Sequence, residues 1–213
     1  MGLQLTNMIY GAYPNRYVGC CITGRLGIGK SSYALKVMYE LFKRLGYNDT
    51  DAWEKTLSCC LFEIKDVVKF LVESSNADEH EYVMLWDDLR IHCGGTKYFT
   101  NMRQVEKLTG VLDSVRTSIS GLLMTTPSTS GLLGVLRSYD DYIVKIRHTQ
   151  EGGDNRMAIG YLWDTLPSGK RLIHKRFIDA YSCYLPKKIY DRYMIKRKDA
   201  QKRALGRLEK VIE

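Results

Sequence analysis

A glycine-rich turn joins a predicted strand to a predicted helix near the amino end of the chain. Residues 17–22 (YVGCCI) form a short apolar run that predicts a buried strand. Residues 32–41 (SYALKVMYEL) carry apolar side chains at three- and four-residue spacing, which predicts a helix. The stretch GRLGIGKSS, residues 24–32, lies between them. Such a turn leaves backbone N–H groups free at the positive end of a helix, so this part of the chain is a candidate anion site.

The same turn matches the phosphate-binding pattern G-x-x-x-x-G-K-[ST], known as Walker A or P-loop. Glycines let the backbone wrap around a phosphate without side chains in the way. Lys30 supplies a positive charge for the β- and γ-phosphates of a nucleotide, and the Ser31 hydroxyl can ligate Mg²⁺. The alternative, a glycine-rich turn with an incidental Lys-Ser, explains neither the strand before it nor the helix after it. The sequence therefore predicts a site for ATP and Mg²⁺ in this loop, with the candidate binding residues Gly24, Arg25, Leu26, Gly27, Ile28, Gly29, Lys30, Ser31 and Ser32.

Two adjacent carboxylates follow a second apolar run. Residues 82–86 (YVMLW) predict a buried strand, and Asp87 and Asp88 come directly after it. Ligands of open α/β sheets bind at the carboxyl ends of the strands, so both carboxylates are expected at the phosphate site. Asp87 is the candidate Walker B residue, which holds Mg²⁺ through water, and Asp88 is the candidate base for the attacking water. In the alternative interpretation, either Asp only caps the segment that follows.

Strands and helices alternate along the chain, which favours an α/β fold with a mainly parallel sheet and helices on both faces. We expect a core domain, residues 1–150, and a C-terminal extension, residues 151–213, that consists of a β-hairpin and a basic helix. The predicted strands are 17–22, 58–62, 82–86, 120–126 and 141–147, with a hairpin at 157–163 and 170–176. The predicted helices are 30–45, 63–74, 103–117 and 129–137, and a last one begins at Pro186.

Residues 120–138 (SGLLMTTPSTSGLLGVLRS) form an apolar run that ends in two threonines and leads into a predicted helix. Together with the two motifs above, this layout resembles the additional-strand class of P-loop NTPases, which includes the AAA+ proteins and the HerA/FtsK-like DNA motors. The likeness covers about residues 16–148 and extends, in general layout, to small ATPases of archaeal plasmids and viruses. It implies a three-layer α/β/α fold in which strand 120–126 lies between strands 17–22 and 82–86. Small kinases generally pair the latter two strands directly.

The resemblance also implies roles for particular residues. Thr125 or Thr126 matches the polar sensor that faces the γ-phosphate. Arg137 matches the arginine finger that acts on the nucleotide of a neighbouring subunit, and Arg116 is a second candidate. The alternative for either arginine is an ordinary cation at a helix end. The chain departs from the family at Asp88, where a glutamate is usual.

The net charge of +8 is concentrated at the carboxyl end. Residues 186–213 contain ten Lys or Arg and four Asp or Glu, which favours a polyanionic partner, with DNA the first candidate, bound through cations of 187–210. Drawn as a helix, five cations share one broad face: Arg192, Lys196, Arg203, Arg207 and Lys210. In the alternative, an amphipathic helix docks on the body through apolar residues: Ile189, Tyr193, Leu205, Leu208 and Ile212. Both can hold on opposite faces of one helix.

No apolar run approaches the ~20 residues that span a bilayer, so we expect no membrane association. The amino end lacks the basic start and apolar stretch of a secretory signal, so we expect a cytoplasmic protein, in the host cytoplasm if a plasmid or virus encodes it. The six cysteines show no Cys-x-x-Cys spacing, which argues against a zinc site. Four of them lie in apolar runs, where cysteine behaves as a small hydrophobic residue: Cys20, Cys21, Cys59 and Cys60.

Three functions stay open at this point. The first is a Mg²⁺-dependent ATPase coupled to DNA as a motor, loader or remodeller, in a homo-oligomer. The second is a nucleoside or nucleotide kinase, which has a P-loop at this chain length but usually needs an arginine-rich lid, and residues 147–156 hold few arginines. The third is a nucleotide-gated binding protein in which Asp88 is catalytically idle.

Overall fold

The computed structural model describes residues 2–77, 79–89, 110, 113, 115–128, 141–149, 153–165 and 171–212. Within them, a seven-stranded sheet has the order β2-β3-β4-β1-β5-β6-β7. The first five strands in this order are parallel, and β6 and β7 add an antiparallel hairpin. The strands are β1 (Val18–Thr23), β2 (Cys60–Leu61), β3 (Glu81–Trp86), β4 (Ile119–Thr126), β5 (Tyr142–His148), β6 (Asn155–Thr165) and β7 (Arg171–Ser182).

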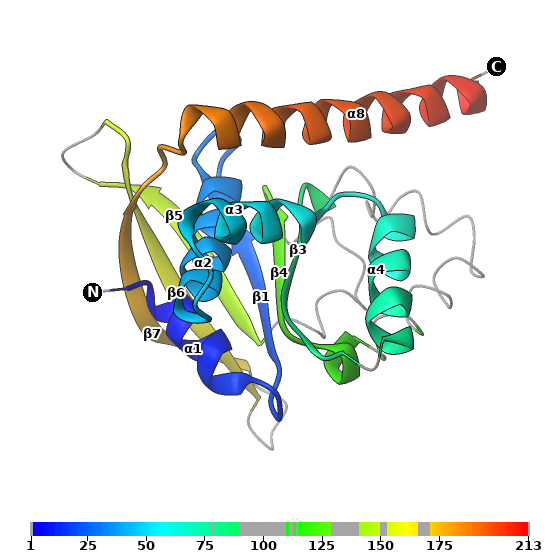
Figure 1. Ribbon diagram of the computed structural model, residues 1–213. Coiled ribbons are helices and arrows are strands. Elements are labelled where there is room, and N and C mark those ends of the chain that lie inside the picture. Colours follow the sequence, from blue (N-terminus) through cyan, green and yellow to red (C-terminus); the bar gives the residue numbers. More distant parts are fainter. Residues whose placement is uncertain are drawn as a thin grey trace.

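Helices cover both faces of this sheet, as Figure 1 shows. The helices α1 (Gln4–Ala12), α2 (Lys30–Arg44) and α3 (Asp49–Ser58) lie on one side, and α4 (Ile64–Asn76) lies on the other. Strand β3 shows the division of the core: Val83 and Leu85 belong to the cluster with α1, α2 and α3. Met84 and Trp86 belong to the second cluster, with α4. The predicted three-layer α/β/α architecture is confirmed.

Strand β4 lies between β1 and β3, which confirms the strand order that the resemblance implied. All eight of its residues are buried, as expected for the continuous apolar run of a central parallel strand. The register pairs Thr23 with Thr126 and Trp86 with Met124, so the three strands end at the same edge. The glycine-rich turn, the two threonines and the two carboxylates therefore meet at one edge of the sheet.

Several predicted elements differ from the structure. The predicted strand 58–62 is reduced to Cys60–Leu61, because the residues before it form α3. Neither α1 nor α3 was predicted. The predicted helix 129–137 lies outside the described residues, and of 103–117 only a few positions are described, which are helical. The hairpin is confirmed and longer than predicted, and because β6 pairs with β5 it continues the core sheet. A domain boundary near residue 150 stays a prediction.

The hairpin is tied to the amino-terminal part of the chain by a buried carboxylate of β7. Asp179 accepts hydrogen bonds from the Gln4 backbone N–H, at 2.8 Å, and from Tyr33 Oη of α2, at 2.6 Å. Burial and this carboxylate raise the pKa of the Tyr33 hydroxyl well above 10, so it stays protonated and donates. The contact fixes β7 against the helix that begins at Lys30.

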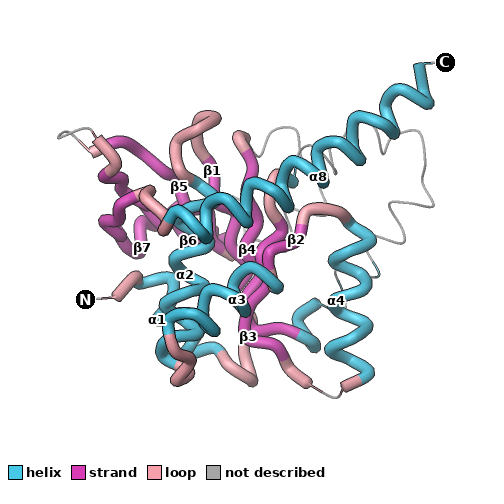
Figure 2. Tube along the Cα trace, turned by 45° about the horizontal axis from the view of Figure 1, so that its top comes forward, coloured by secondary structure: helices cyan, strands magenta, loops and turns pink. Residues whose placement is uncertain are grey.

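The last helix, α8 (Lys187–Ile212), crosses the edge of the sheet at which the parallel strands end. Figures 1 and 2 show it from two directions, lying over the ends of these strands rather than on either face of the sheet. The buried side chains of Ile189 and Tyr193 hold it there. The helix predicted from the basic segment thus lies above the candidate phosphate site.

Candidate nucleotide-binding site

The loop between β1 and α2 has the backbone conformation of a phosphate-binding turn. Gly24, Gly27 and Gly29 have positive φ angles of 148°, 74° and 100°, a region that other residues rarely adopt. Gly29 also directly precedes α2, and a Cβ atom there would lie 3.0 Å from the Cys183 Cβ. The turn therefore favours glycine at all three positions, and at Gly29 the close approach of the chain after β7 favours it as well.

Lys30 is the first residue of α2, and its ammonium group lies against the loop. Nζ donates to the backbone oxygens of Gly24, at 3.0 Å, and of Arg25, at 2.9 Å. Burial lowers the pKa of Lys30 below its ordinary value, and the carboxylates of Asp88 and Asp87 oppose this shift. The ammonium thus lies within the electrostatic range of both acids, as the predicted phosphate site requires.

Asp87 follows β3 directly and is fully buried. Its Oδ1 accepts hydrogen bonds from Ser31 Oγ, at 2.9 Å, and from Thr125 Oγ1, at 2.5 Å. Its Oδ2 accepts one from Tyr193 Oη of α8, at 2.5 Å. A buried carboxylate is tolerated only when it is well paired, and three hydroxyl groups meet this need here. The structure brings together Ser31 and Asp87, the two candidate metal-binding residues.

Asp88 lies in a left-handed backbone conformation, with φ 52°, which Asp tolerates better than most residues. Its N–H donates to Thr125 Oγ1, at 3.0 Å, and its Oδ2 lies 2.7 Å from Arg197 Nε of α8. Burial and the neighbouring Asp87 raise the pKa of Asp88 above 3.8, whereas Arg197 lowers it. The candidate base is therefore held in an ion pair with the last helix.

The two threonines at the end of β4 have different surroundings. Thr125 contacts both acids, because its hydroxyl donates to Asp87 and accepts from the Asp88 backbone. The Thr126 hydroxyl instead donates to the Ser128 backbone oxygen, at 2.9 Å. Of the two sensor candidates, Thr125 is the one in contact with the acids.

The two arginine-finger candidates lie elsewhere. Arg137 lies outside the described residues. Arg116 is exposed and precedes β4, so it lies at the end of the sheet opposite to the acids. A finger role for either residue stays a prediction, and for Arg116 it would have to act on another copy of the chain.

Four side chains of the C-terminal segment reach the site, and no sequence motif pointed to any of them in this role. Arg156 Nε donates to the Ile28 backbone oxygen, at 3.1 Å, and Tyr181 Oη donates to that of Gly29, at 2.9 Å. Both come from the hairpin and support the loop from outside. Tyr193 and Arg197 come from α8 and contact the two acids. Their one-turn spacing was visible in the sequence, but nothing there said where the helix docks.

The docked helix corrects the prediction of its DNA-binding face. Three cations of that face point toward the body: Arg192 forms a bidentate ion pair with Glu54, and Arg203 pairs with Glu63. Lys196 Nζ donates to the Leu57 backbone oxygen, at 2.5 Å. The other two cations of the predicted face, Arg207 and Lys210, have no described side chain. The docking alternative is supported by buried Ile189 and Tyr193, but Leu205, which it also named, is 61% exposed.

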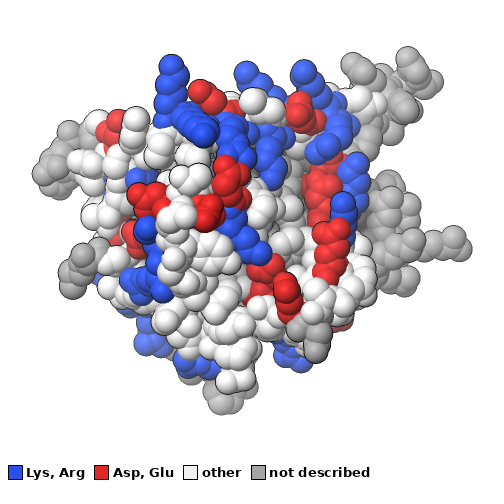
Figure 3. Space-filling model, viewed as in Figure 1, with Lys and Arg blue, Asp and Glu red and all other residues white. Residues whose placement is uncertain are grey.

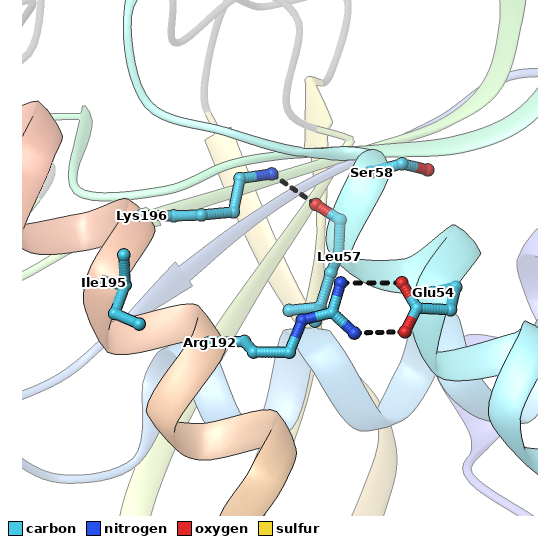
Figure 4. A pocket seen from close by; sticks show the side chains of 6 residues that line it. All are labelled: Glu54, Leu57, Ser58, Arg192, Ile195 and Lys196. Carbon is cyan, nitrogen blue, oxygen red and sulfur yellow. Dashed lines mark hydrogen bonds and ion pairs between the residues drawn. The ribbon is translucent and has the colours of Figure 1, made fainter.

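A cleft of about 400 Å³ lies between α3 and α8, bridged by the ion pair of Arg192 with Glu54 (Figure 4). Figure 4 shows Arg192 and Lys196 pointing from α8 toward α3. The cleft is lined by Glu54, Leu57, Ser58, Arg192, Ile195 and Lys196. None of them belongs to the loop or the acid pair, so the cleft belongs to the docking contact of α8.

The residues at the sheet edge fit a Mg²⁺–nucleotide complex in type and placement. A hydroxyl and a carboxylate stand together at Ser31 and Asp87, and Mg²⁺ in such sites takes only one or two protein ligands beside phosphate and water. Within the described ranges, no group of three or more His, Cys, Asp or Glu side chains could hold a metal by itself. The pairing of one hydroxyl with one carboxylate suits a metal that arrives with a phosphate ligand.

No protein-family model matches the sequence. A curated viral protein, the uncharacterized protein B-251 of Sulfolobus spindle-shape virus 1, is 27% identical over 216 residues, which cover 98% of this chain and 84% of that protein. None of the helices in the described part of the chain is long and apolar enough to cross a bilayer.

Two solved structures are similar to this chain, both with low TM-scores and low sequence identity. The N-terminal domain of zonular occludens toxin from Neisseria meningitidis has a TM-score of 0.45 and 14% identity, covering 83% of this chain and 98% of that one. B204, the DNA-packaging ATPase from Sulfolobus turreted icosahedral virus, has a TM-score of 0.43 and 13% identity, covering 76% and 99%. Likenesses at this level assign no function to the chain. The loop, the strand order and the acid pair of this chain agree with the P-loop NTPase layout that its sequence resembles.

Proposed function

We propose that this chain is a Mg²⁺-dependent P-loop ATPase that acts on nucleic acid. The observation that carries the proposal is the 2.9 Å hydrogen bond between Ser31 Oγ and Asp87 Oδ1. It joins the start of α2 to the end of β3 across the intervening strand β4. A Walker A hydroxyl and a Walker B carboxylate would hold Mg²⁺ on the phosphates from such positions.

The residues of the loop and of the acid pair would divide the work as follows. The loop N–H groups and the amino end of α2 bind the phosphates, and Lys30 neutralises their charge. Ser31 and Asp87 hold Mg²⁺, which, when bound, offsets negative charge on the phosphoryl oxygens. Asp88 orients a water and accepts its proton as the water oxygen bonds to the γ-phosphorus. The bond from that phosphorus to the bridging oxygen breaks, and ADP leaves with the electron pair.

The nucleic-acid contact is proposed for the outer face of α8. Four lysines there are exposed and have no ion-pair partner among the described residues: Lys187, Lys188, Lys198 and Lys202. Figure 3 shows Lys and Arg side chains gathered along this helix. Point charges on flexible stems contact phosphates without reading bases, so we expect binding to DNA without sequence preference.

The chain is also proposed to act as a homo-oligomer in the cytoplasm, or in a host cytoplasm if a virus or plasmid encodes it. The proposal of an oligomer rests on the arginine finger, which Arg137 of a neighbouring copy would supply. The ATPase assignment does not depend on the oligomer.

The kinase alternative loses support at two points. The strand order places β4 between β1 and β3, whereas small kinases generally pair the latter two directly. Arg156, one of the few arginines near the predicted lid position, is 8% exposed and bonded to the Ile28 backbone oxygen. An arginine held in this way supports the loop and is not available to close over a bound nucleotide.

Phosphate release from ATP, measured with and without duplex DNA and with nucleoside acceptors, separates the three functions. Stimulation by DNA supports the proposal, phosphorylation of an acceptor supports a kinase, and ATP binding without turnover supports a nucleotide-gated binding protein. Lys30→Ala serves as the blank, since a contaminating ATPase would survive this substitution. To test the DNA contact, the four outer lysines are replaced together by glutamine. Truncation after Leu185 is not used, because it would also remove Tyr193 and Arg197 from the site.

A further inference from the structure

Helix α8 places two side chains, one helical turn apart, on the two acids of the candidate site. Tyr193 Oη contacts Asp87 Oδ2, and Arg197 Nε contacts Asp88 Oδ2, at 2.5 and 2.7 Å. The other described cations of α8 that form ion pairs reach acids outside the site, in α3 and at the start of α4. Arg197 is therefore distinguished from its neighbours on the same helix by the partner that it contacts.

The guanidinium of Arg197 is only partly used by this ion pair. Its side chain is 31% exposed, and the contact to Asp88 involves Nε. Among the described residues, no acceptor is hydrogen-bonded to its two terminal nitrogens. A guanidinium has five donors in a planar fork that matches a phosphate group, so the free donors can bind a second anion.

The position of Arg197 relative to Lys30 indicates which anion this would be. Lys30 contacts the β- and γ-phosphates in a P-loop. Lys30 directly precedes Ser31, whose hydroxyl donates to Asp87 Oδ1 at 2.9 Å, and Asp87 is the chain neighbour of Asp88. Asp88, the candidate for holding the attacking water, lies next to Arg197. An anion placed between these groups would be the terminal phosphate of a nucleotide.

We propose that Arg197 is a γ-phosphate-binding residue that α8 supplies to the nucleotide site of its own chain. Without nucleotide, it neutralises Asp88. When ATP is bound, its guanidinium pairs with the γ-phosphate, and Asp88 becomes free to hold the attacking water. This inference rests on the proposed function, and it adds that α8, with its outer row of lysines, is linked to the presence of the γ-phosphate.

The test compares equilibrium binding of a non-hydrolysable ATP analogue and of ADP, both with Mg²⁺, to the wild-type chain, Arg197→Ala and Arg197→Lys. ADP lacks the phosphate that Arg197 contacts. Loss of a charge-assisted pair weakens binding by about ten- to a hundredfold. We therefore expect Arg197→Ala to lose about this factor for the ATP analogue and less than about threefold for ADP, with Arg197→Lys between the two.

Arg192→Ala is the matched control. It removes a docking ion pair one turn and a half away on the same helix, so it reports the effect of loosening α8 alone. The control should leave the ratio of ATP to ADP affinity unchanged. An equal loss of both affinities in Arg197→Ala, which leaves their ratio unchanged, or no loss of either affinity would overturn the inference. If the wild-type chain binds no ATP analogue, the proposed function fails as well; if it binds ATP in a Lys30-dependent way, only the inference is at stake.

Discussion

The hydroxyl of Tyr193 provides a direct test of how α8 is docked on the site. Asp87 is fully buried, and Tyr193 Oη is the donor to its Oδ2, at 2.5 Å. Burial and the Asp87 carboxylate raise the pKa of this hydroxyl far above 10, so it donates throughout the ordinary pH range. Tyr193→Phe keeps the ring, which packs near Phe62, and removes only the donor.

The expected cost follows from the charge and burial of the acceptor. A hydrogen bond to a charged group contributes about 1.5–3 kcal/mol, and removing its donor leaves a buried carboxylate oxygen unpaired. For a chain of 213 residues, each kcal/mol corresponds to about 2–4 °C in melting temperature. Tyr193→Phe should therefore lower the melting temperature by about 3–12 °C.

Thermal unfolding followed by circular dichroism measures this change. Tyr190→Phe is the matched control, because Tyr190 lies on the same helix and is 50% exposed, so losing its hydroxyl should change the free energy of unfolding by less than about 0.5 kcal/mol. A Tyr193→Phe chain that melts at the same temperature as the control would show that α8 does not donate to Asp87. The proposal for Arg197 would then lose its structural basis.

Three further predictions concern the acids, the outer lysines and the thiols. Asp88→Asn should keep ATP binding and reduce hydrolysis by roughly 10²-fold, the scale of general-base catalysis, and an unchanged single-turnover rate would exclude Asp88 as the base. Replacing the four outer lysines by glutamine should weaken binding to duplex DNA and leave ATP affinity unchanged. The slope of the logarithm of the DNA-binding constant against the logarithm of the salt concentration should become shallower by ~0.9 for each phosphate that is no longer neutralised. An unaltered slope would show that DNA binds elsewhere on the protein. Burial raises the pKa of the Cys59 thiol to about 11, so it should be unreactive toward a disulfide reagent at pH 8 until the chain is unfolded, and rapid labelling of the native chain would contradict its burial. The same protection is expected for the other buried thiols, Cys20, Cys21 and Cys60.

The parts of the fold that local patterns determine were predicted from the sequence. The glycine-rich loop and the strand that ends at Asp87 follow from short motifs and apolar runs, whereas the place of strand 120–126 in the sheet followed from the resemblance to the additional-strand class. Helix α3 was missed because its sequence, DTDAWEKTLS, has few apolar residues. Its start could have been recognised from Asn48, whose side chain caps the helix by accepting a hydrogen bond from the Asp51 N–H. Such an element is stabilised mainly by its cap and by tertiary packing.

The orientation of α8 could not be predicted in the same way. Its spacing defines a basic face, but a row of arginines can face solvent or a set of acids. The partners of Arg192 and Arg203 are Glu54 and Glu63, more than a hundred residues earlier in the chain. The supporting contacts of Arg156 and Tyr181 are likewise long-range hydrogen bonds to backbone oxygens, which leave no residue pattern in the sequence. Roles that depend on tertiary contacts required the structure.

Equilibrium binding of ATP to the wild-type chain and to Lys30→Ala, each with and without Mg²⁺, tests whether this loop is the nucleotide site. The wild-type chain should bind ATP more tightly when Mg²⁺ is present, because Ser31 and Asp87 then act through the metal. Lys30→Ala should lose binding under both conditions, since Arg25 occupies a variable position of the loop and cannot replace the missing ammonium. Wild-type affinity in Lys30→Ala, or no binding by the wild-type chain, would contradict the assignment of this loop as the nucleotide site.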